Sequence, residues 1–300
     1  MRKNETSVVS QQPMGQQNHS VLMPPNGHPQ YSVLRTEFAL YRRFVAARVR
    51  GQMQYRASFV MQLFSSFAGA VFELIALLIV FGRFTTLGGW TVGEVAFLYA
   101  LSSISFGTHA VLTAGFDDFS VMILQGEFDR VLTRPVTPFM QVLAADFQLR
   151  RLGRVAQGIV ALVIALTHTH VAWTVGKLLY FPVVIASGVM LFAGITVLGA
   201  TLTFWTLQRT EMINVFTYGG TFMSSYPISI YPQWMRHAVT FLIPLAFVSY
   251  YPGLYFLDRP DPLGLPGLMR FLAPLVSVCF FAIAWRVWEW GVRQYQSTGS

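Results

Sequence analysis

The charged residues that could support chemistry or binding are concentrated in one stretch of the chain, from Asp117 to Gln141. Elsewhere the chain is strongly apolar, since 54% of its 300 residues are hydrophobic and only 11% are charged. The stretch carries four carboxylates and two guanidinium groups, from Asp117, Asp118, Glu127, Asp129, Arg130 and Arg134. We therefore expect it to be exposed and available to bind another molecule.

Pro135 divides this stretch into two parts. Proline cannot continue a helix and disfavours helical backbone at Arg134, so a helix through Asp129 to Thr133 should end there. Thr137 followed by Pro138 has the residue types preferred at an N-cap and at the first helical position. The sequence therefore predicts a helix, a turn and a second helix at a membrane surface.

The motifs of common enzymes and nucleotide-binding proteins are absent from the sequence. The pair Gly176-Lys177 is followed by Leu178 and does not complete a G-x-x-x-x-G-K-[ST] phosphate loop. No H-E-x-x-H or G-x-S-G motif occurs. His168 and His170 have no third metal ligand nearby. We expect no catalytic residue, no metal site and no cofactor on this chain.

The composition predicts an all-α polytopic membrane protein. A soluble domain averages about 25% charged residues, so 11% is too few for a solvated surface of this size. Apolar runs long enough to cross a bilayer recur along most of the chain. They predict six transmembrane helices, at about 59–81, 92–114, 155–173, 178–207, 213–230 and 268–288.

The apolar run from about 232 to 257 differs from these six. Arg236 and His237 enter it early, and Pro244 and Pro252 interrupt it. Irregular backbone at membrane depth is tolerated where protein covers it, so we expect a re-entrant pair of short helices. A full crossing is the alternative.

The beginning of the chain changes character near residue 33. Residues 1–32 are rich in Gln, Asn, Pro and Ser, which predicts a disordered cytosolic tail. An apolar stripe at helical spacing follows, and arginines lie off it; the stripe is Leu34, Phe38, Tyr41 and Val45. This pattern favours a helix lying flat on an anionic membrane surface. A helix packed on a soluble neighbour would have the same pattern. Residues 294–300 form a short C-terminal tail.

The distribution of positive charge predicts the topology. With six spans and a cytosolic N-terminus, sixteen of the 21 Lys and Arg residues lie inside and five outside. This split satisfies the positive-inside rule and places both termini and the Asp117–Gln141 stretch in the cytosol. A seventh crossing near Trp234 would leave fourteen inside and seven outside, which fits the rule less well.

Glu73 lies in the middle of the first predicted span. A charged residue at a helix centre costs about 2.5 to 3.5 kcal/mol on insertion scales, so Glu73 should be protonated, paired or in a wet cavity. It either contacts substrate or pairs structurally with a residue such as His109 or Asn214. Three aromatic residues at a spacing of four, Tyr218, Phe222 and Tyr226, are further candidates for a substrate path. Ordinary helix packing explains their spacing equally well.

Two segments resemble a known family. Gly126 to Leu132 with Arg134-Pro135 resembles the G-x-F-D-x-x-L-x-x-P cytosolic loop of one bacterial branch of the ABC-2 type (type-2 ABC exporter) permeases. Tyr226-Pro227 through Tyr231-Pro232, Pro244-Leu245-Ala246-Phe247 and Tyr251-Pro252 are similar to the re-entrant region of that branch. The resemblance covers roughly Leu34 to Arg293.

The resemblance implies a role for the cytosolic stretch. In this family the loop between spans two and three is a coupling helix that sits in a cleft of a cytosolic ATPase. By position, the residues at this contact are Glu127, Phe128, Asp129, Arg130, Leu132, Arg134 and Pro135. An exposed Phe128 and Leu132 among charges would suit an anchored interface with a polar rim. A solvated loop that merely joins two spans is the alternative.

The resemblance also implies partners and location. It implies a permease of an ATP-driven exporter in the bacterial inner membrane, which moves a lipid-like, glycan or drug-like substrate by alternating access. ATP and Mg²⁺ would bind a separate ATPase in two copies, and a second permease, either a related chain or another copy, would complete the assembly. We expect contact with membrane lipids and none with nucleic acid. A secondary transporter, or another polytopic protein without an ATPase, is the competing hypothesis.

Replacing Glu73 distinguishes its two roles. If Glu73 contacts substrate, Glu73→Gln should lower the export rate or alter the range of exported substrates, because the carboxylate is lost while the shape is kept. Transport by the reconstituted complex measures this. An unchanged rate and range would exclude the functional role.

Overall fold

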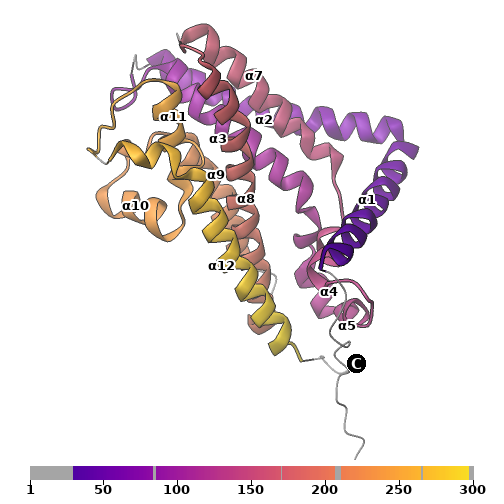
Figure 1. Cartoon of the computed structure of the whole chain (residues 1–300). Helices are drawn as coiled ribbons and strands as arrows, with labels where there is room; N and C mark the ends of the chain where they lie inside the picture. Colours follow the sequence, from indigo (N-terminus) through magenta and orange to yellow (C-terminus); the bar gives the residue numbers. More distant parts are fainter. Residues whose placement is uncertain (1–29, 84–85, 170, 207–210, 265, 297–300) are drawn as a thin grey trace, which may run out of the picture.

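The computed structural model describes residues 30–83, 86–169, 171–206, 211–264 and 266–296. Most of the predicted tail, residues 1–29, lies outside this part of the chain, as do the side chains of Glu73 and Asn214. The regular secondary structure that is described consists of helices and one isolated β-bridge, between Leu87 and Trp90. The predicted all-α class is confirmed (Figure 1).

Twelve α-helices make up the described chain, and short 3-10 or π-helical turns connect several of them. The α-helices are α1 (Gln30–Gln54), α2 (Arg56–Arg83), α3 (Val92–Leu112), α4 (Phe119–Leu124), α5 (Glu127–Leu132), α6 (Pro138–Leu143), α7 (Leu152–His168), α8 (Val175–Thr206), α9 (Glu211–Ser225), α10 (Gln233–His237), α11 (Tyr250–Phe256) and α12 (Ala273–Gln294). The turns are η1 (Ala114–Phe116), η2 (Leu149–Arg151), η3 (Ile228–Ile230), η4 (Ala238–Leu242), η5 (Leu245–Phe247) and η6 (Gly267–Phe271).

Long apolar helices form the body of the molecule. Within the described ranges, α3, α8 and α12 are long and apolar enough to cross a membrane. The 32 residues of α8 extend about 48 Å, more than the roughly 30 Å of hydrocarbon, so a membrane-spanning α8 must tilt or project. Helices α2, α7 and α9 occupy the positions of the other three predicted spans, and α7 has 17 residues and α9 has 15. The count of six spans stays a prediction.

The segment from Gln233 to Phe256 is bent. Its two halves, Gln233–Leu242 and Leu245–Phe256, meet at an angle of 76°, and Pro244 lies at the break. Both ends of the segment lie near the start of α3. Before it, the Ser229 hydroxyl accepts a hydrogen bond from Trp90 Nε1 (3.1 Å), and after it, Arg259 binds Glu94 (2.7 Å). The segment therefore begins and ends at the same end of the molecule.

Glycines allow α3 and α7 to pack with their backbones in contact. A Cβ added to Gly107 would lie 2.9 Å from the Val155 nitrogen, and one added to Gly158 would lie 2.9 Å from the Ile104 nitrogen. Real Cβ atoms do not approach backbone this closely, so larger residues at either position would force the helices apart. Helices α3 and α7 are therefore closely packed along their length.

An aromatic cluster joins the short helices α4–α6 to the ends of α8 and α12. Trp288 is buried at its centre, with ring centroids 5.0 Å from Phe119, 5.4 Å from Phe116 and 5.5 Å from Phe204. Tilted and edge-to-face ring pairs at such distances stabilise a fold beyond the area that they bury. The cluster attaches the predicted cytosolic stretch to two long helices.

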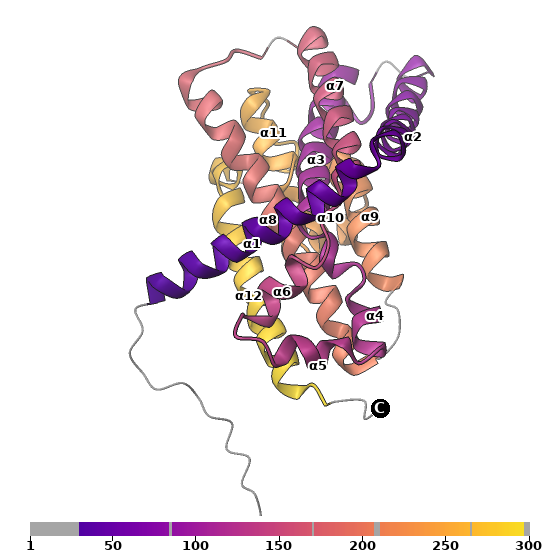
Figure 2. The same ribbon diagram turned by 90° about the vertical axis from the view of Figure 1, so that its right-hand side faces the viewer.

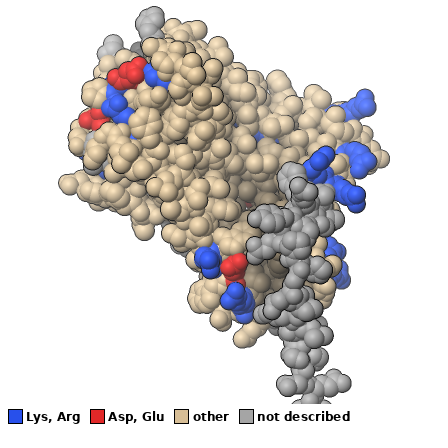
Figure 3. All heavy atoms as spheres, viewed as in Figure 1, with Lys and Arg blue, Asp and Glu red and all other residues tan. Residues whose placement is uncertain are grey.

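Charged side chains lie toward opposite ends of the molecule. Figure 3 shows Lys, Arg, Asp and Glu near the α11 end and near the α4–α5 end, and further Lys and Arg on the side where α1 meets α2. The surface between the α11 end and these two groups is almost uncharged. Helix α1 crosses the upright helices at an angle, above α4–α6 in Figure 2. The charge distribution suits a bilayer whose hydrocarbon covers the uncharged zone.

Removing Trp288 should destabilise the protein. Trp288→Ala empties the centre of the aromatic cluster, so the free energy of unfolding should fall by about 3 to 5 kcal/mol. Unfolding of the purified protein in mild detergent, followed by tryptophan fluorescence, measures the change. Trp290→Ala is the matched control, because Trp290 is 55% exposed. Equal effects of the two substitutions would contradict the central role of Trp288.

Candidate functional site

Helices α4, α5 and α6 form a compact unit after α3. Helix α5 begins after Gly126, whose φ of 68° lies in the left-handed region that favours glycine. It ends at Leu132, and α6 begins with Thr137 as N-cap and Pro138 in its first turn. The predicted helix, turn and second helix are confirmed.

The turn between α5 and α6 is held by one side chain. The Gln141 amide donates hydrogen bonds to the carbonyl oxygens of Val131 and Val136, both at 2.8 Å. The Val131 carbonyl lies in the last turn of α5, and the Val136 carbonyl lies in the turn before α6, so one side chain joins the two. The turn between α5 and α6 is therefore ordered by side-chain hydrogen bonds.

The inward face of α5 corrects one expectation. Phe128 is fully buried, with ring centroids 5.0 Å from Tyr295, 5.4 Å from Phe119 and 5.6 Å from Phe204. The prediction that Phe128 is exposed was wrong. Phe128 and Val131 are three residues apart, so they share one face of the helix, and burying a phenylalanine contributes about 1.5 to 3 kcal/mol. This apolar pair was the signal in the sequence, and the neighbouring charges obscured it.

The outward face of α5 carries charges around an apolar residue. Leu132 is 43% exposed, as predicted, and the exposed charged residues on this face are Glu127, Arg130 and Arg134, next to Pro135. Leu124 of α4, which sequence reasoning missed, is also exposed, at 50%. The α4–α5 region therefore exposes two leucines as well as three charged residues.

Asp129 belongs to neither face alone. Asp129 is half-buried, and the pKa of the Tyr295 hydroxyl is raised by burial and by the negative charge of the Asp129 carboxylate. Tyr295 follows the end of α12, so Asp129 contacts the C-terminal part of the chain. Asp129 is therefore better placed to hold α5 in position than to contact a partner.

Arg151 connects the two sides of the cytosolic stretch. Its guanidinium forms an ion pair with Asp117 and donates hydrogen bonds to the Ala110 carbonyl (3.1 Å) and to Gln148 Oε1 (2.8 Å). Burial raises the pKa of the Asp117 carboxyl, and the charge of Arg151 acts in the opposite direction. The end of α3 and the start of α7 are thereby held together beside α4–α6.

A second polar network lies at the opposite end of the molecule. Arg259 binds both carboxylate oxygens of Glu94 at 2.7 Å, donates to the Gly89 carbonyl at 2.7 Å and lies 4.2 Å from the Trp90 ring centroid. Glu94 also completes a capping box with Thr91 at the start of α3. Glu94, an ionisable group near a predicted span boundary, therefore has a structural role here.

Lys177 extends this network. It is buried, and its ammonium group binds Asp258 (2.6 Å) and the Phe256 carbonyl (2.9 Å). Asp258 has a positive φ of 49°, a strained conformation for a residue with a side chain. The ion pair helps to hold the turn after α11 in that conformation.

The structure describes the surroundings of four of the six candidate path residues, His109, Tyr218, Phe222 and Tyr226, and the rings of His109 and Tyr218 both pack against Phe106. His109 is buried between Phe106 and Phe192, and its Nε2 is 2.8 Å from the Thr196 hydroxyl. The structure thus gives His109 a partner on α8, whereas α2, which carries Glu73, packs against α7. The side chains of Glu73 and Asn214 lie outside the described residues.

The aromatic stripe of α9 divides between two surroundings. Tyr218 and Phe222 are about half exposed, while Tyr226 packs against the core. The opposite face of α9 carries buried hydroxyls, which sequence reasoning missed: the Ser102 and Ser224 hydroxyls are 2.7 Å apart, and Ser102 donates to the Thr221 carbonyl. Hydroxyl residues at helical spacing were the signal for this polar contact between α3 and α9.

Within the described part of the chain, no group of three His, Cys, Asp or Glu residues is arranged to hold a metal ion. Each end of the molecule thus has a polar network, the middle is largely apolar, and α5 exposes charged side chains. This arrangement suits transmission of movement between a soluble partner and membrane helices.

Comparison with known proteins identifies the family. The model described as ABC-2 family transporter protein matches residues 67–299, most of the chain and all of α3 to α12. A search of the curated proteins gave no match. The matched region includes α5 and the bent segment, which are the two segments with the distinctive sequences. The chain therefore belongs to the ABC-2 transporter family and is a membrane permease of an ABC transporter.

Proposed function

We propose that the protein is the transmembrane subunit of an ATP-driven exporter and couples hydrolysis on a separate ATPase to outward movement of an amphiphilic substrate. The observation that carries this proposal is the division of α5 into two faces. Charged side chains and Leu132 face outward, whereas Phe128 is fixed among aromatic rings. One face suits a partner, and the other suits transmission of movement into the membrane.

The transmission step follows from the packing. Phe128 contacts Phe204 of α8 and Tyr295 beyond α12, and α8 and α12 pack against each other. Close-packed interiors resist compression and pass displacement on to their neighbours. A movement imposed on the outward face of α5 is then carried to α8 and α12, which changes access to the path between the spans.

The proposed assembly contains other chains. ATP and Mg²⁺ bind on the ATPase, present in two copies, because this chain has no phosphate-binding loop. A second permease, a related chain or another copy of this one, completes the membrane part. Apolar side chains exposed on α2 and α9 suit lipid or this second permease; they include Val60, Met61, Phe64, Ile79, Tyr218 and Phe222.

The proposed topology has six spans in the bacterial inner membrane, with both termini in the cytosol. The re-entrant arrangement of Gln233–Phe256 is supported by the contacts of its two ends with residues 89–94. At its middle, the Ser249 hydroxyl donates to the Ser224 carbonyl of α9. If the segment enters and leaves the membrane on the same side, α12 is the last crossing.

Cysteine labelling tests this topology. In a Cys279→Ala background, Gln233→Cys and Pro262→Cys should both react with a membrane-impermeant maleimide from outside intact cells, because the two ends of a re-entrant segment share one side. Glu127→Cys should react after the membrane is opened. Labelling of residues 233 and 262 from opposite sides would establish a full crossing and contradict the proposal.

Charge reversal tests the coupling surface. Glu127→Arg should weaken binding of the ATPase at least tenfold and lower export, because Glu127 is exposed on the outward face of α5. The permease should stay folded, since its inward contacts are unchanged. Titration of the ATPase onto nanodisc-embedded permease measures the affinity.

Arg50→Glu is the matched control, because Arg50 is exposed on α1 and does not line the pocket that Phe44 and Arg48 form with Glu127 and Arg130. Asp129 is less suitable as a test position, since its contact with Tyr295 mixes folding with binding. Parental affinity and export in Glu127→Arg would contradict the assignment of α5 as the coupling helix. Export without any ATPase would favour a secondary transporter.

A further inference from the structure

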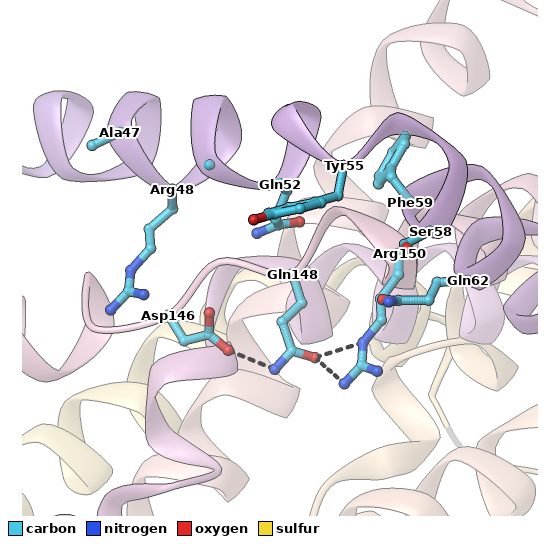
Figure 4. A pocket seen from close by; sticks show the side chains of 11 residues that line it. Ala47, Arg48, Gln52, Tyr55, Ser58, Phe59, Gln62, Asp146, Gln148 and Arg150 are labelled. Carbon is cyan, nitrogen blue, oxygen red and sulfur yellow. Dashed lines mark hydrogen bonds between the residues drawn. The ribbon is translucent and has the colours of Figure 1, made fainter.

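A polar cavity of about 660 Å³ lies at the elbow where α1 meets α2 (Figure 4). One wall comes from the end of α1 and the start of α2, and the other comes from residues 146–150, which lead into α7. In Figure 4 the side chains of Arg48, Gln52 and Tyr55 project from the helices toward Asp146 and Gln148. Segments distant in sequence thus build one site.

Hydrogen bonds hold the two walls in place. The Gln52 amide donates to the Phe147 carbonyl, and Gln52 Oε1 accepts from the Leu149 N–H at 3.1 Å. Gln148 Oε1 in turn accepts from Arg150 Nε (3.2 Å) and Nη2 (3.0 Å). The cavity is therefore preorganised, which lowers the entropy cost of binding a ligand.

The charges of the cavity favour an anion. Arg48 and Arg150 line it, and neither has a carboxylate partner among the residues that the structure describes. Asp146, the carboxylate in the lining, already accepts hydrogen bonds from the Phe147 N–H (2.8 Å) and from Gln148 (2.5 Å). The lining therefore carries two guanidinium groups and one carboxylate that already accepts two hydrogen bonds, and in Figure 4 Asp146 and Gln148 lie between Arg48 and Arg150. Planar guanidinium groups match the oxygens of phosphate particularly well.

The surface next to the cavity is apolar. Phe59 lies in the lining itself, and the next turns of α2 expose Val60 (59%), Met61 (73%) and Phe64 (71%). These residues begin the first long apolar run of the chain. A ligand with a phosphate group in the cavity and acyl chains along α2 would satisfy both surfaces. A free phosphate ion would leave most of a 660 Å³ cavity empty.

We propose that this cavity binds the headgroup of an anionic phospholipid from the cytosolic leaflet, with Arg48 and Arg150 as the two positive charges that attract it. The inference rests on the proposed topology, which places α1 and residues 146–150 at the cytosolic surface. Basic pockets between helices on that side of a membrane are suited to anionic headgroups. The bound lipid links α1 and α2 to the segment that carries Arg151, and so to Asp117 beside the coupling surface.

The test uses the full-length permease purified in mild detergent without its ATPase. Phosphatidylglycerol, phosphatidylcholine or inorganic phosphate is added, and native mass spectrometry and thermal unfolding report binding. Phosphatidylglycerol should bind at least tenfold more tightly than phosphatidylcholine and raise the unfolding temperature. Arg48→Gln should reduce phosphatidylglycerol affinity at least tenfold, and so should Arg150→Gln.

Arg50→Gln is the control, because Arg50 is exposed on the same helix but does not line the cavity. Among the residues drawn in Figure 4, Arg48 makes no hydrogen bond to the other wall, so Arg48→Gln keeps the test valid if Arg150→Gln unfolds. Equal affinity for the two lipids, or equal losses in Arg48→Gln and Arg50→Gln, would overturn the proposal. An equal response to inorganic phosphate would identify an ion site instead of a lipid site. None of these outcomes depends on an ATPase, so failure here is distinct from failure of the coupling proposal.

Discussion

The insertion of Phe128 into the aromatic cluster is the contact on which the α4–α6 end of the structure depends. A six-residue helix such as α5 is too short to be stable alone in water, so its position must come from tertiary contacts. Phe128 provides them through rings of α4, α8 and the residues after α12. The same contact that orients the outward charges also attaches them to the long helices. The packing of Phe128 therefore matters both for folding and for the proposed coupling.

The opposite end is held by charge instead of aromatic packing. Arg259 and Glu94 pair in a partly buried setting, with the Trp90 ring and the Gly89 carbonyl completing the surroundings of the guanidinium. Removing one partner of such a pair leaves an uncompensated charge, which is more costly than the pair is stabilising. The network holds the residues that follow the bent segment against the start of α3. Any movement in the molecule is then expected in the helices between the two ends.

The elbow between α1 and α2 is a third point at which distant segments are joined, and it carries the proposed lipid site. Gln52 holds residues 147–149 by hydrogen bonds, while Arg48 and Arg150 keep their charge available for a headgroup. Because Arg151 follows directly and binds Asp117, the lipid environment and the coupling surface share one short segment. In the proposed assembly, this segment lies between the contact with the ATPase and the lipid headgroup.

The sequence by itself determined the helical class, the positions of the long helices and the break at Pro135, because apolar runs, proline geometry and charge placement are local properties. It also pointed to the α5 region as a binding surface. Tertiary structure decided which face of α5 is buried, since Phe128 has charged neighbours along the chain and aromatic neighbours only in space. It likewise paired His109 with Thr196 and assembled the elbow cavity, because residues 146–150 come to lie against the α1–α2 elbow only after α7 has packed against α2.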